Sequence, residues 1–238
     1  MGFKRGGELQ TVRDCSWDLT PAAARQLQEE LREQVVVAGG PVPEAIHFVA
    51  GLDVSFDKKN GLLYAAVVVL RVPELTVIEK STAVMPAVFP YIPGLLAFRE
   101  GPALLKAFEG INMTPDLLVF DGQGIAHPRG LGIASHMGVL LQRPSIGVAK
   151  SLLVGEYTEP PPARGAYSLL FYRGKAVGTV LRTRTAIKPV FVSPGHLVGI
   201  EEANKLVLAL CRRFRLPEPI RAAHHLSCTL RRPLQNRA

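Results

Sequence analysis

Three apolar segments follow one another with very short links, and this feature constrains the fold more than any other in the sequence. The segments span about Phe48 to Phe56, Leu62 to Val72 and Leu75 to Val84. The links between them are Asp57–Gly61 and the Pro73-Glu74 pair. Because strands joined by links this short pair in opposite directions, the sequence predicts a three-stranded antiparallel meander.

After the meander, helical and strand patterns alternate to the end of the chain. The expected elements are a helix at about Leu95–Phe108, a strand ending at Asp121, a helix at about Gly132–Gln142, strands at Ser145–Ala149, Ala166–Tyr172 and Lys175–Arg182, and helices at about Gly199–Arg213 and Pro217–Leu226. This order is typical of an α/β, ribonuclease-H-like mixed sheet, in which parallel strands follow three antiparallel ones and helices flank the sheet.

One more helix is expected before the meander. Thr20-Pro21 is a helix-start signal, because threonine caps helices and proline suits the first helical position. The helix should span about residues 20–37 and end at Gly39-Gly40-Pro41. Since no repeat or linker divides the chain, we expect residues 1–238 to form one domain, with a loose basic tail at about residues 231–238.

Charge and cysteine content narrow the class of protein. Lys and Arg outnumber Asp and Glu by 28 to 20, and the net charge of +8 favours a polyanionic partner such as nucleic acid. Cys15, Cys211 and Cys228 show no disulfide or metal-type spacing, so we expect reduced thiols in a cytoplasmic protein. No apolar run reaches the roughly 18 residues that cross a bilayer. The segment Met1–Glu8 is not followed by the apolar stretch of a secretory signal, so no membrane contact is expected.

A short apolar run ends at an acidic residue in the segment Pro115–Gly130. Leu117 to Phe120 has the pattern of a strand buried on both faces, and Asp121 follows where the run stops. In an open α/β sheet this is the edge at which ligands bind. The alternative is an aspartate that merely opens a turn.

Two further acidic residues stand in unusual places. Asp53 lies in an otherwise apolar strand, where a buried carboxylate must be paired or bound to a metal. Its alternative is a position near the strand end that faces water. Glu100 lies at a helix start, where acids are common because of the backbone dipole. In a ribonuclease-H-like sheet the first and fourth strands are neighbours, so Asp53 and Asp121 are expected to share a cation, and oxygen ligands favour Mg²⁺ or Mn²⁺.

Six short motifs occur in a fixed order between about Gly51 and His224. They are Phe89-Pro-Tyr-Ile-Pro-Gly94, Leu95-Leu-Ala-Phe-Arg-Glu-Gly-Pro102, Asp121-Gly-Gln-Gly-Ile-Ala-His-Pro-Arg129, Gly147-Val-Ala-Lys150, Lys188-Pro-Val-Phe-Val-Ser-Pro-Gly-His196 and Leu216-Pro-Glu-Pro219. Together they resemble the endonuclease V family, the deoxyinosine 3′ endonucleases. Several motifs in the same order are far more specific than any single pattern.

The resemblance implies an activity in DNA repair. It implies a metal-dependent endonuclease that recognises a deaminated base, deoxyinosine, in DNA. The enzyme would hydrolyse the second phosphodiester bond 3′ to the lesion and leave 3′-hydroxyl and 5′-phosphate ends. Its cofactor would be Mg²⁺, with Mn²⁺ as a substitute, and its partner deoxyinosine-containing DNA. A monomer is the expected form.

The resemblance also implies a set of metal ligands. Asp53, Glu100 and Asp121 match the metal-binding carboxylates. Family members often have a fourth acid after the Leu-Pro-Glu-Pro element, and here His224 stands at that position. Imidazole is neutral and softer than a carboxylate, which affects metal preference. The adjacent His225 leaves a one-residue alternative, and a surface histidine pair is the other.

A Pro-rich loop is expected to probe the base. Tyr91 stands between Pro90 and Pro93, followed by Gly94, with Ile92 beside it. Enzymes that extrude a base must fill the gap left in the stack, and an aromatic ring on a stiffened loop suits this role. The alternative is a tyrosine packed under the loop.

Glycines and polar residues complete the expected site. Gly122 and Gly124 are expected to form a pocket that reads the base through main-chain groups. His127 matches the family's active-site histidine and is expected to contact phosphate or order metal-bound water. Lys150 matches the lysine near the scissile phosphate, where it would stabilise developing charge. For both, the alternative is ordinary surface polarity. No step can be assigned to His196.

Two other functions remain open at this point. The first is an inosine-specific endoribonuclease that acts on single-stranded RNA with the same catalytic residues. The second is a non-catalytic module that binds inosine-containing nucleic acid. The presence of Asp53, Glu100 and Asp121 argues against the second, and substrate preference would decide on the first.

Overall fold

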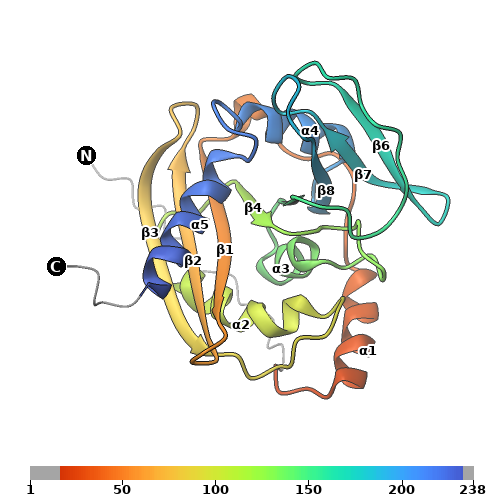
Figure 1. The fold of residues 1–238 in the computed structure, drawn as a ribbon. Helices are drawn as coiled ribbons and strands as arrows, with labels where there is room; N and C mark the ends of the chain where they lie inside the picture. The colour runs from red at the N-terminus through yellow and green to blue at the C-terminus, as the bar shows by residue number, and fades with distance from the viewer. Residues whose placement is uncertain (1–16, 233–238) are drawn as a thin grey trace.

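Eight strands form one mixed sheet at the centre of the fold (Figure 1). The protein is seen here as a computed structural model, which describes residues 17–232. In chain order the strands are β1 (Phe48–Asp57), β2 (Leu62–Arg71), β3 (Thr76–Pro86), β4 (Leu117–Asp121), β5 (Ser145–Ala149), β6 (Tyr167–Tyr172), β7 (Lys175–Leu181) and β8 (Val190–His196). Across the sheet their order is β3-β2-β1-β4-β5-β8-β7-β6.

Helices cover both faces of the sheet. They are α1 (Pro21–Arg32), the short 3₁₀ helix η1 (Pro43–Ala45), α2 (Leu96–Glu109), α3 (Ile133–Leu141), α4 (Ile200–Ala209) and α5 (Glu218–Arg231). α2 and α3 share one apolar core with β1, β2 and β4, and α1 lies beside α3. α4 and α5 pack on the opposite face in a second core. β4 contributes Leu118 and Phe120 to the first core and Leu117 and Val119 to the second, as expected for a strand buried on both faces.

The strand directions confirm the predicted ribonuclease-H-like mixed sheet. β1, β2 and β3 form the antiparallel meander. β4 pairs with β1 in parallel, so the first and fourth strands are neighbours, and β5 extends the parallel part. Beyond β5 the strands run antiparallel again. The parallel segment is therefore confined to the centre of the sheet, where ligands of such sheets bind.

β8, which lies between β5 and β7, was not predicted from the sequence. Its apolar start at Val190–Val192 is a strand signal, but Pro194 and Gly195 disfavour a strand. The structure tolerates them because β7 pairs with β8 only as far as Val192. On the other side, the pairing with β5 shifts register next to Ser145. The end of β8 that contains Pro194 and Gly195 therefore does not need to form regular hydrogen bonds to both neighbouring strands.

The N-terminal helix is shorter than predicted. Its start is as expected, since the Thr20 side chain accepts a hydrogen bond from the Ala23 amide. It ends at Arg32 and not near Val37, because the backbone of Val36 bonds elsewhere. The Val36 amide donates to His196 Nδ1 over 3.2 Å, and its carbonyl accepts from the Leu197 amide over 2.7 Å. These bonds also give His196 a structural role at the end of β8.

The two C-terminal helices also differ from their predicted ends. α4 stops at Ala209 and not at Arg213. Next to its end, the Arg164 guanidinium donates hydrogen bonds to the carbonyl oxygens of Leu208 and Cys211. α5 continues past Leu226 to Arg231, whose guanidinium donates to the Phe56 carbonyl over 3.1 Å. The expected tail therefore cannot begin at residue 231. Its last six residues, like Met1–Glu8, lie outside the described range.

Within residues 17–232, no helix combines the length and the apolar character needed to cross a membrane. Cys211 and Cys228 are free thiols, while Cys15 lies outside the described residues.

Gly51 allows α5 to lie directly on β1. A Cβ at this position would be 2.0 Å from the carbonyl oxygen of Pro219, at the start of α5. Gly51→Ala should therefore destabilise the protein by about 1–3 kcal/mol, as overpacking does, and lower the midpoint of thermal unfolding. Gly61→Ala is the comparison, since that site is open and only its positive φ of 68° opposes a side chain. Equal midpoints for Gly51→Ala and the wild type would contradict the close packing.

Candidate active site

Asp53 and Asp121 lie at corresponding positions of the parallel strands β1 and β4. The pairing of these strands runs up to Leu52 and Phe120, so the next residue on each strand is one of the two aspartates. Because side chains alternate between the faces of a sheet, both carboxylates belong to the face that α5 covers. Asp53 is buried and so does not face water, which removes the plainest alternative for it.

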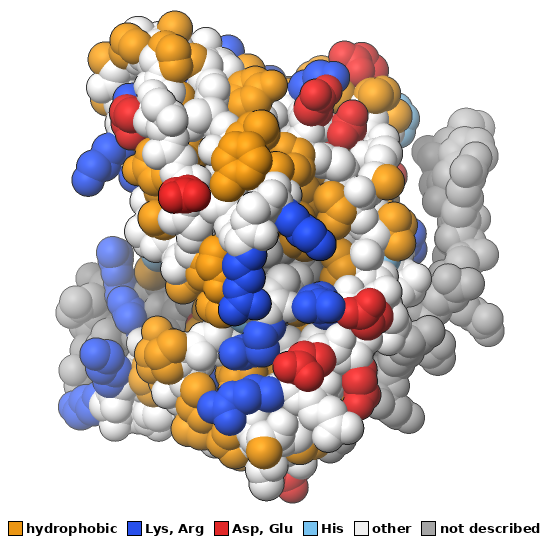
Figure 2. All heavy atoms as spheres, turned by 90° about the vertical axis from the view of Figure 1, so that its right-hand side faces the viewer, with side chains coloured by type: hydrophobic (Ala, Val, Ile, Leu, Met, Phe, Trp, Pro, Cys, Tyr) orange, Lys and Arg blue, Asp and Glu red, His pale blue; other side chains and the backbone are white. Residues whose placement is uncertain are grey.

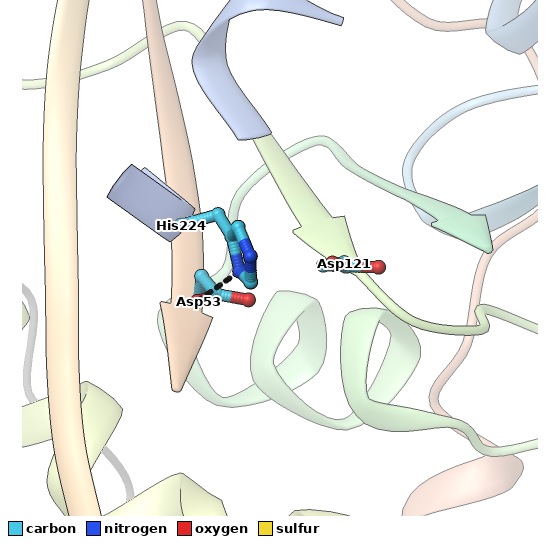
Figure 3. A group of neighbouring side chains, drawn as sticks. All are labelled: Asp53, Asp121 and His224. Atoms are coloured by element: carbon cyan, nitrogen blue, oxygen red, sulfur yellow. Dashed lines mark hydrogen bonds and ion pairs between the residues drawn. The ribbon is translucent and has the colours of Figure 1, made fainter. Parts of the chain in front are cut away.

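α5 adds a histidine to the two carboxylates (Figure 3). His224 Nδ1 lies 3.2 Å from Asp53 Oδ2. One ligand atom each of Asp53, Asp121 and His224 lies within 4.8 Å of the other two. The structure thus places His224, and not His225, in this group. One turn further along the helix, the Ser227 hydroxyl donates to the same Asp53 oxygen over 2.5 Å.

The electrostatics of the group fit a divalent cation. Burial raises the pKa of Asp53 and the negative charge of Asp121 raises it further, whereas the hydrogen bond from Ser227 and the neighbouring His224 lower it. A cation among these side chains would relieve the repulsion between the two carboxylates. Two carboxylates and one imidazole suit Mn²⁺ well and leave room for Mg²⁺ with its own water ligands.

Glu100 on α2 approaches the carboxylates from another direction. It is not one of the three residues whose ligand atoms meet within 4.8 Å. Burial raises its pKa to about 8, and the charges of Asp53 and Asp121 add to this, against the lowering effect of Arg99. Its alternative, a solvated acid on a first helical turn, does not describe this environment. In the metal-free protein a proton on Glu100 offsets the crowding of negative charge.

This pKa predicts a pH-dependent stability for the metal-free protein. The folded state holds the Glu100 proton more tightly than the unfolded state, whose pKa is near 4.5. The resulting stability is fully present below about pH 4.5 and is lost as the pH rises toward 8. Glu100→Gln stays neutral, so in EDTA it should unfold at a higher temperature than the wild type at pH 8, with the difference shrinking toward pH 4.5. Parallel unfolding curves over this range would contradict the assignment.

Lys150 stands next to Asp121 on the loop after β5. Its Nζ lies 2.5 Å from Asp121 Oδ2, and its side chain is 44% exposed. The ion pair holds the ammonium group beside the two carboxylates, at a position that is open to solvent. The role of Lys150 beside a scissile bond stays a prediction.

An apolar cavity of about 350 Å³ adjoins Asp121. Its lining comes from the Pro-rich loop, the glycine-rich loop after β4 and the loop after β5, together with residues of α1, α2 and α3. The lining includes Tyr91, Ile92, Pro93, Gly94, Asp121, Gly122, Gln123, His127, Lys150 and Leu152. Pockets with apolar walls and a few convergent polar groups are the usual binding sites of small planar ligands. Of the predicted base-binding residues, Pro90 and Gly124 are not in this lining.

The side chain of Tyr91 is exposed to solvent. Its side chain is 70% exposed, so it is not packed under the Pro-rich loop. The loop itself is held at its first end by Phe89, which packs on Phe98 and whose carbonyl accepts a hydrogen bond from Arg99 over 2.6 Å. The ring of Tyr91 therefore projects from a loop whose base is fixed.

Gly124 has a packing role and not the expected contact with a base. A Cβ there would lie 1.9 Å from the carbonyl oxygen of Pro194 in β8. Its amide donates to the Ser193 hydroxyl over 2.7 Å, and its carbonyl accepts from the Gly132 amide. The amide of Gly124 has one hydrogen to donate, so it is not available to a ligand. Gly122, by contrast, is part of the lining.

His127 is buried at the pocket and does not belong to the surface. Burial lowers its pKa to about 4 and the charge of Arg129 lowers it further, while a hydrogen bond to the backbone of Gly94 opposes the shift. Its Nδ1 accepts from the Arg129 amide over 3.2 Å. At neutral pH the ring is therefore uncharged, and any contact with phosphate would be a neutral hydrogen bond.

Two polar residues of the site, Ser227 and Gln28, were not predicted from the sequence. Ser227 stands three residues after His224, so both lie on the same side of α5. Gln28 is buried on α1 and lines the cavity, at helical spacing from the buried Ala24 and Leu31. A glutamine on an apolar helix stripe is a signal that could have been noticed, because a buried amide needs partners.

Comparison with known proteins agrees with this architecture. The family model described as Endonuclease V matches residues 29–225. The Endonuclease V of Dehalococcoides mccartyi is 50% identical over 209 residues, which cover 88% of this chain and 93% of that protein. The Endonuclease V of Trichormus variabilis is 48% identical over 219 residues, which cover 92% of this chain and 99% of that protein.

Solved structures show the same fold. The Endonuclease V of Streptomyces avermitilis superposes with a TM-score of 0.87 at 43% identity, covering 90% of this chain and 94% of that one. The Ciona intestinalis Endonuclease V in complex with a 24mer DNA containing an inosine followed by a ribo-adenosine has a TM-score of 0.78 at 30% identity, with 88% and 96% covered. From its family match, its close relatives and its fold together, the chain belongs to the endonuclease V family and is an endonuclease.

Proposed function

We propose that this endonuclease recognises deoxyinosine in DNA and, with a divalent cation, hydrolyses the second phosphodiester bond on its 3′ side. The products are a 3′-hydroxyl and a 5′-phosphate. One observation carries the proposal: the group of Asp53, Asp121 and His224 adjoins an apolar cavity whose rim bears the exposed Tyr91. A cation site next to a base-sized pocket suits an enzyme that selects a base and cuts nearby.

Asp53, Asp121 and His224 would hold the cation, with Glu100 close enough to join them. A bound Mg²⁺ or Mn²⁺ supplies Lewis acidity toward a phosphate and lowers the pKa of water. Lys150 places a positive charge where negative charge develops on the phosphate. Asp53 stays oriented through its bonds to Ser227 and His224.

Tyr91 and the cavity would act on the base. Tyr91 enters the gap that an extruded base leaves in the stack. The apolar walls of the cavity exclude water from the extruded base. His127 is uncharged and both of its ring nitrogens already bond to the backbone of Arg129 and Gly94, so it does not attract phosphate into the pocket. In this proposal Tyr91 and the cavity select the base, whereas the cation and Lys150 act in hydrolysis of the strand.

The charge of the molecule supports a polyanionic partner. The face that carries α1 shows lysine and arginine side chains gathered along its middle (Figure 2). Arg32, Arg129 and Arg173 line one hollow together with Glu29, Glu30 and Glu33, so the positive charge of these three arginines is partly offset. Contacts of such side chains with phosphates give affinity that is independent of base sequence and sensitive to salt.

The test is strand cleavage at low salt with Mg²⁺ and then Mn²⁺. Matched DNA strands with and without one deoxyinosine are incubated with the wild type and with Asp121→Ala. The proposal predicts a cut one nucleotide beyond the inosine on the 3′ side, which requires the cation and disappears in the variant. Tight binding of the inosine strand without any cut would instead indicate a non-catalytic binding module.

An inosine-specific endoribonuclease is the second candidate. It is favoured by one observation, the ribo-adenosine after the inosine in the DNA bound by the Ciona intestinalis protein. The same assay with an RNA strand carrying one inosine separates the two. A faster cut of RNA than of DNA would make RNA the substrate.

A further inference from the structure

Gln28 of α1 is a buried polar side chain with three partners far away in the chain. Its exposed fraction is 1%. Its Nε2 donates to the carbonyl oxygens of Gly94 over 3.0 Å and of Leu131 over 2.8 Å. Its Oε1 accepts from Nε of Arg129. The side chain amide therefore uses both of its donor hydrogens and its oxygen, and its orientation is fixed.

Arg129 binds both Gln28 and the Gly94 carbonyl. While its Nε binds Gln28, its Nη2 donates to the Gly94 carbonyl over 2.6 Å. The carbonyl of Gly94 thus receives hydrogen bonds from two side chains that also bind each other, and the backbone of Gly94 is in addition bonded to His127. A charged donor and a buried setting make such bonds stronger than those of an exposed amide.

Gly94 is the last residue of the loop that carries Tyr91. It adopts a positive φ of 79°, and a Cβ there would lie 2.7 Å from Nη2 of Arg129. The loop is anchored at its first end by Phe89, whose carbonyl binds Arg99. Gln28 and Arg129 anchor its second end, so the exposed ring of Tyr91 lies between two fixed points.

We propose that Gln28 is a positioning residue, which together with Arg129 holds the loop of Tyr91 in the geometry needed to keep a base out of a duplex. The inference rests on the proposed function, in which Tyr91 fills the gap in the base stack. α1 contributes none of the three residues of the cation site. The role of α1 is then to hold the loop of Tyr91 in place through Gln28.

This role predicts a difference between substrates. In a duplex the enzyme must unpair and unstack the inosine and prevent its return. In a single strand no partner strand competes for the base, so the demand on the loop is smaller. Loss of the brace should therefore slow cleavage of duplex DNA much more than cleavage of the same strand alone.

The experiment compares Gln28→Leu with Gln26→Leu. Gln26 is on the same helix but exposed, and its amide binds only Glu30 in the described structure. Single-turnover rates are measured on a deoxyinosine duplex and on its inosine strand alone. For Gln28→Leu the ratio of duplex to single-strand rate should fall at least about tenfold, since small displacements in a site are costly. For Gln26→Leu it should not change.

Arg129→Lys tests the same contact if Gln28→Leu folds poorly. Lysine keeps the charge but lacks the rigid planar pair of donors, Nε and Nη2, with which Arg129 binds Gln28 and Gly94. The ratio should fall in this variant too. An equal loss on both substrates, or an unchanged ratio in a folded variant, would overturn the inference.

A fluorescence measurement separates this inference from the proposed function. A 2-aminopurine next to the inosine reports unstacking, and an Asp121→Ala background prevents cutting. Binding should raise the fluorescence, and adding Gln28→Leu should remove most of that rise. An equal rise in both proteins would overturn the role of Gln28. If the wild type cuts neither substrate, the proposed function fails, while this measurement still decides on Gln28.

Discussion

Asp121→Asn should reduce cleavage of an inosine-containing strand by about a thousandfold or more, at saturating Mg²⁺. The change removes one negative charge and keeps the size of the side chain. Asp53 and His224 remain, but one carboxylate and one imidazole bind a hard cation weakly. The variant should also lose most of its affinity for Mn²⁺, which calorimetry measures directly on the protein without substrate.

Asp57→Asn is the matched control for this prediction. Asp57 ends β1, four residues after Asp53, and its carboxylate binds Lys59 and Asn60 in the following turn. The same substitution there should leave both cleavage and Mn²⁺ binding unchanged. Rapid cutting by Asp121→Asn, or an equal loss in Asp57→Asn, would show that the cluster is not the catalytic centre.

Lys150→Met should lower the cleavage rate by about a hundredfold and at the same time tighten metal binding. The cleavage rate falls while metal affinity rises because Lys150 acts on the site in two ways. It supplies positive charge beside the phosphate in the reaction. In the free protein its ammonium group forms a 2.5 Å ion pair with the Asp121 carboxylate. An incoming cation must break this ion pair to bind Asp121.

Lys106→Met provides the control, because Lys106 also forms an ion pair with a carboxylate, that of Glu109, but on the exposed surface of α2. It should change neither quantity. Weaker metal binding in Lys150→Met would contradict competition between the ammonium group and the cation. An unchanged cleavage rate would remove Lys150 from the reaction.

The sequence was sufficient to single out Asp53 and Asp121 as candidates for the chemistry. Asp53 and Asp121 interrupt or end apolar strands, where an unpaired carboxylate is costly. The short links of the meander fixed the directions of the first three strands. From these directions the ribonuclease-H-like order followed, and with it the adjacency of β1 and β4.

The middle of the sheet was less accessible to sequence reasoning. β8 was missed because Pro194 and Gly195 contradict a strand locally, and only its limited pairing with β7 makes them tolerable. The expected role of Gly124 depended on free backbone groups, yet those groups bond to Ser193 and Gly132. In both cases the deciding contacts join segments far apart in the chain.

What the sequence by itself determined was local: strand and helix periodicity, the cap at Thr20, and acids and glycines placed at strand ends. These properties depend on neighbours within a few residues. The tertiary structure alone decided that His224 and not His225 meets Asp53, 171 residues away, and that Gln28 reaches Gly94 and Leu131. Such contacts depend on which face of each helix packs against the sheet, and on the need of every buried polar group for a partner.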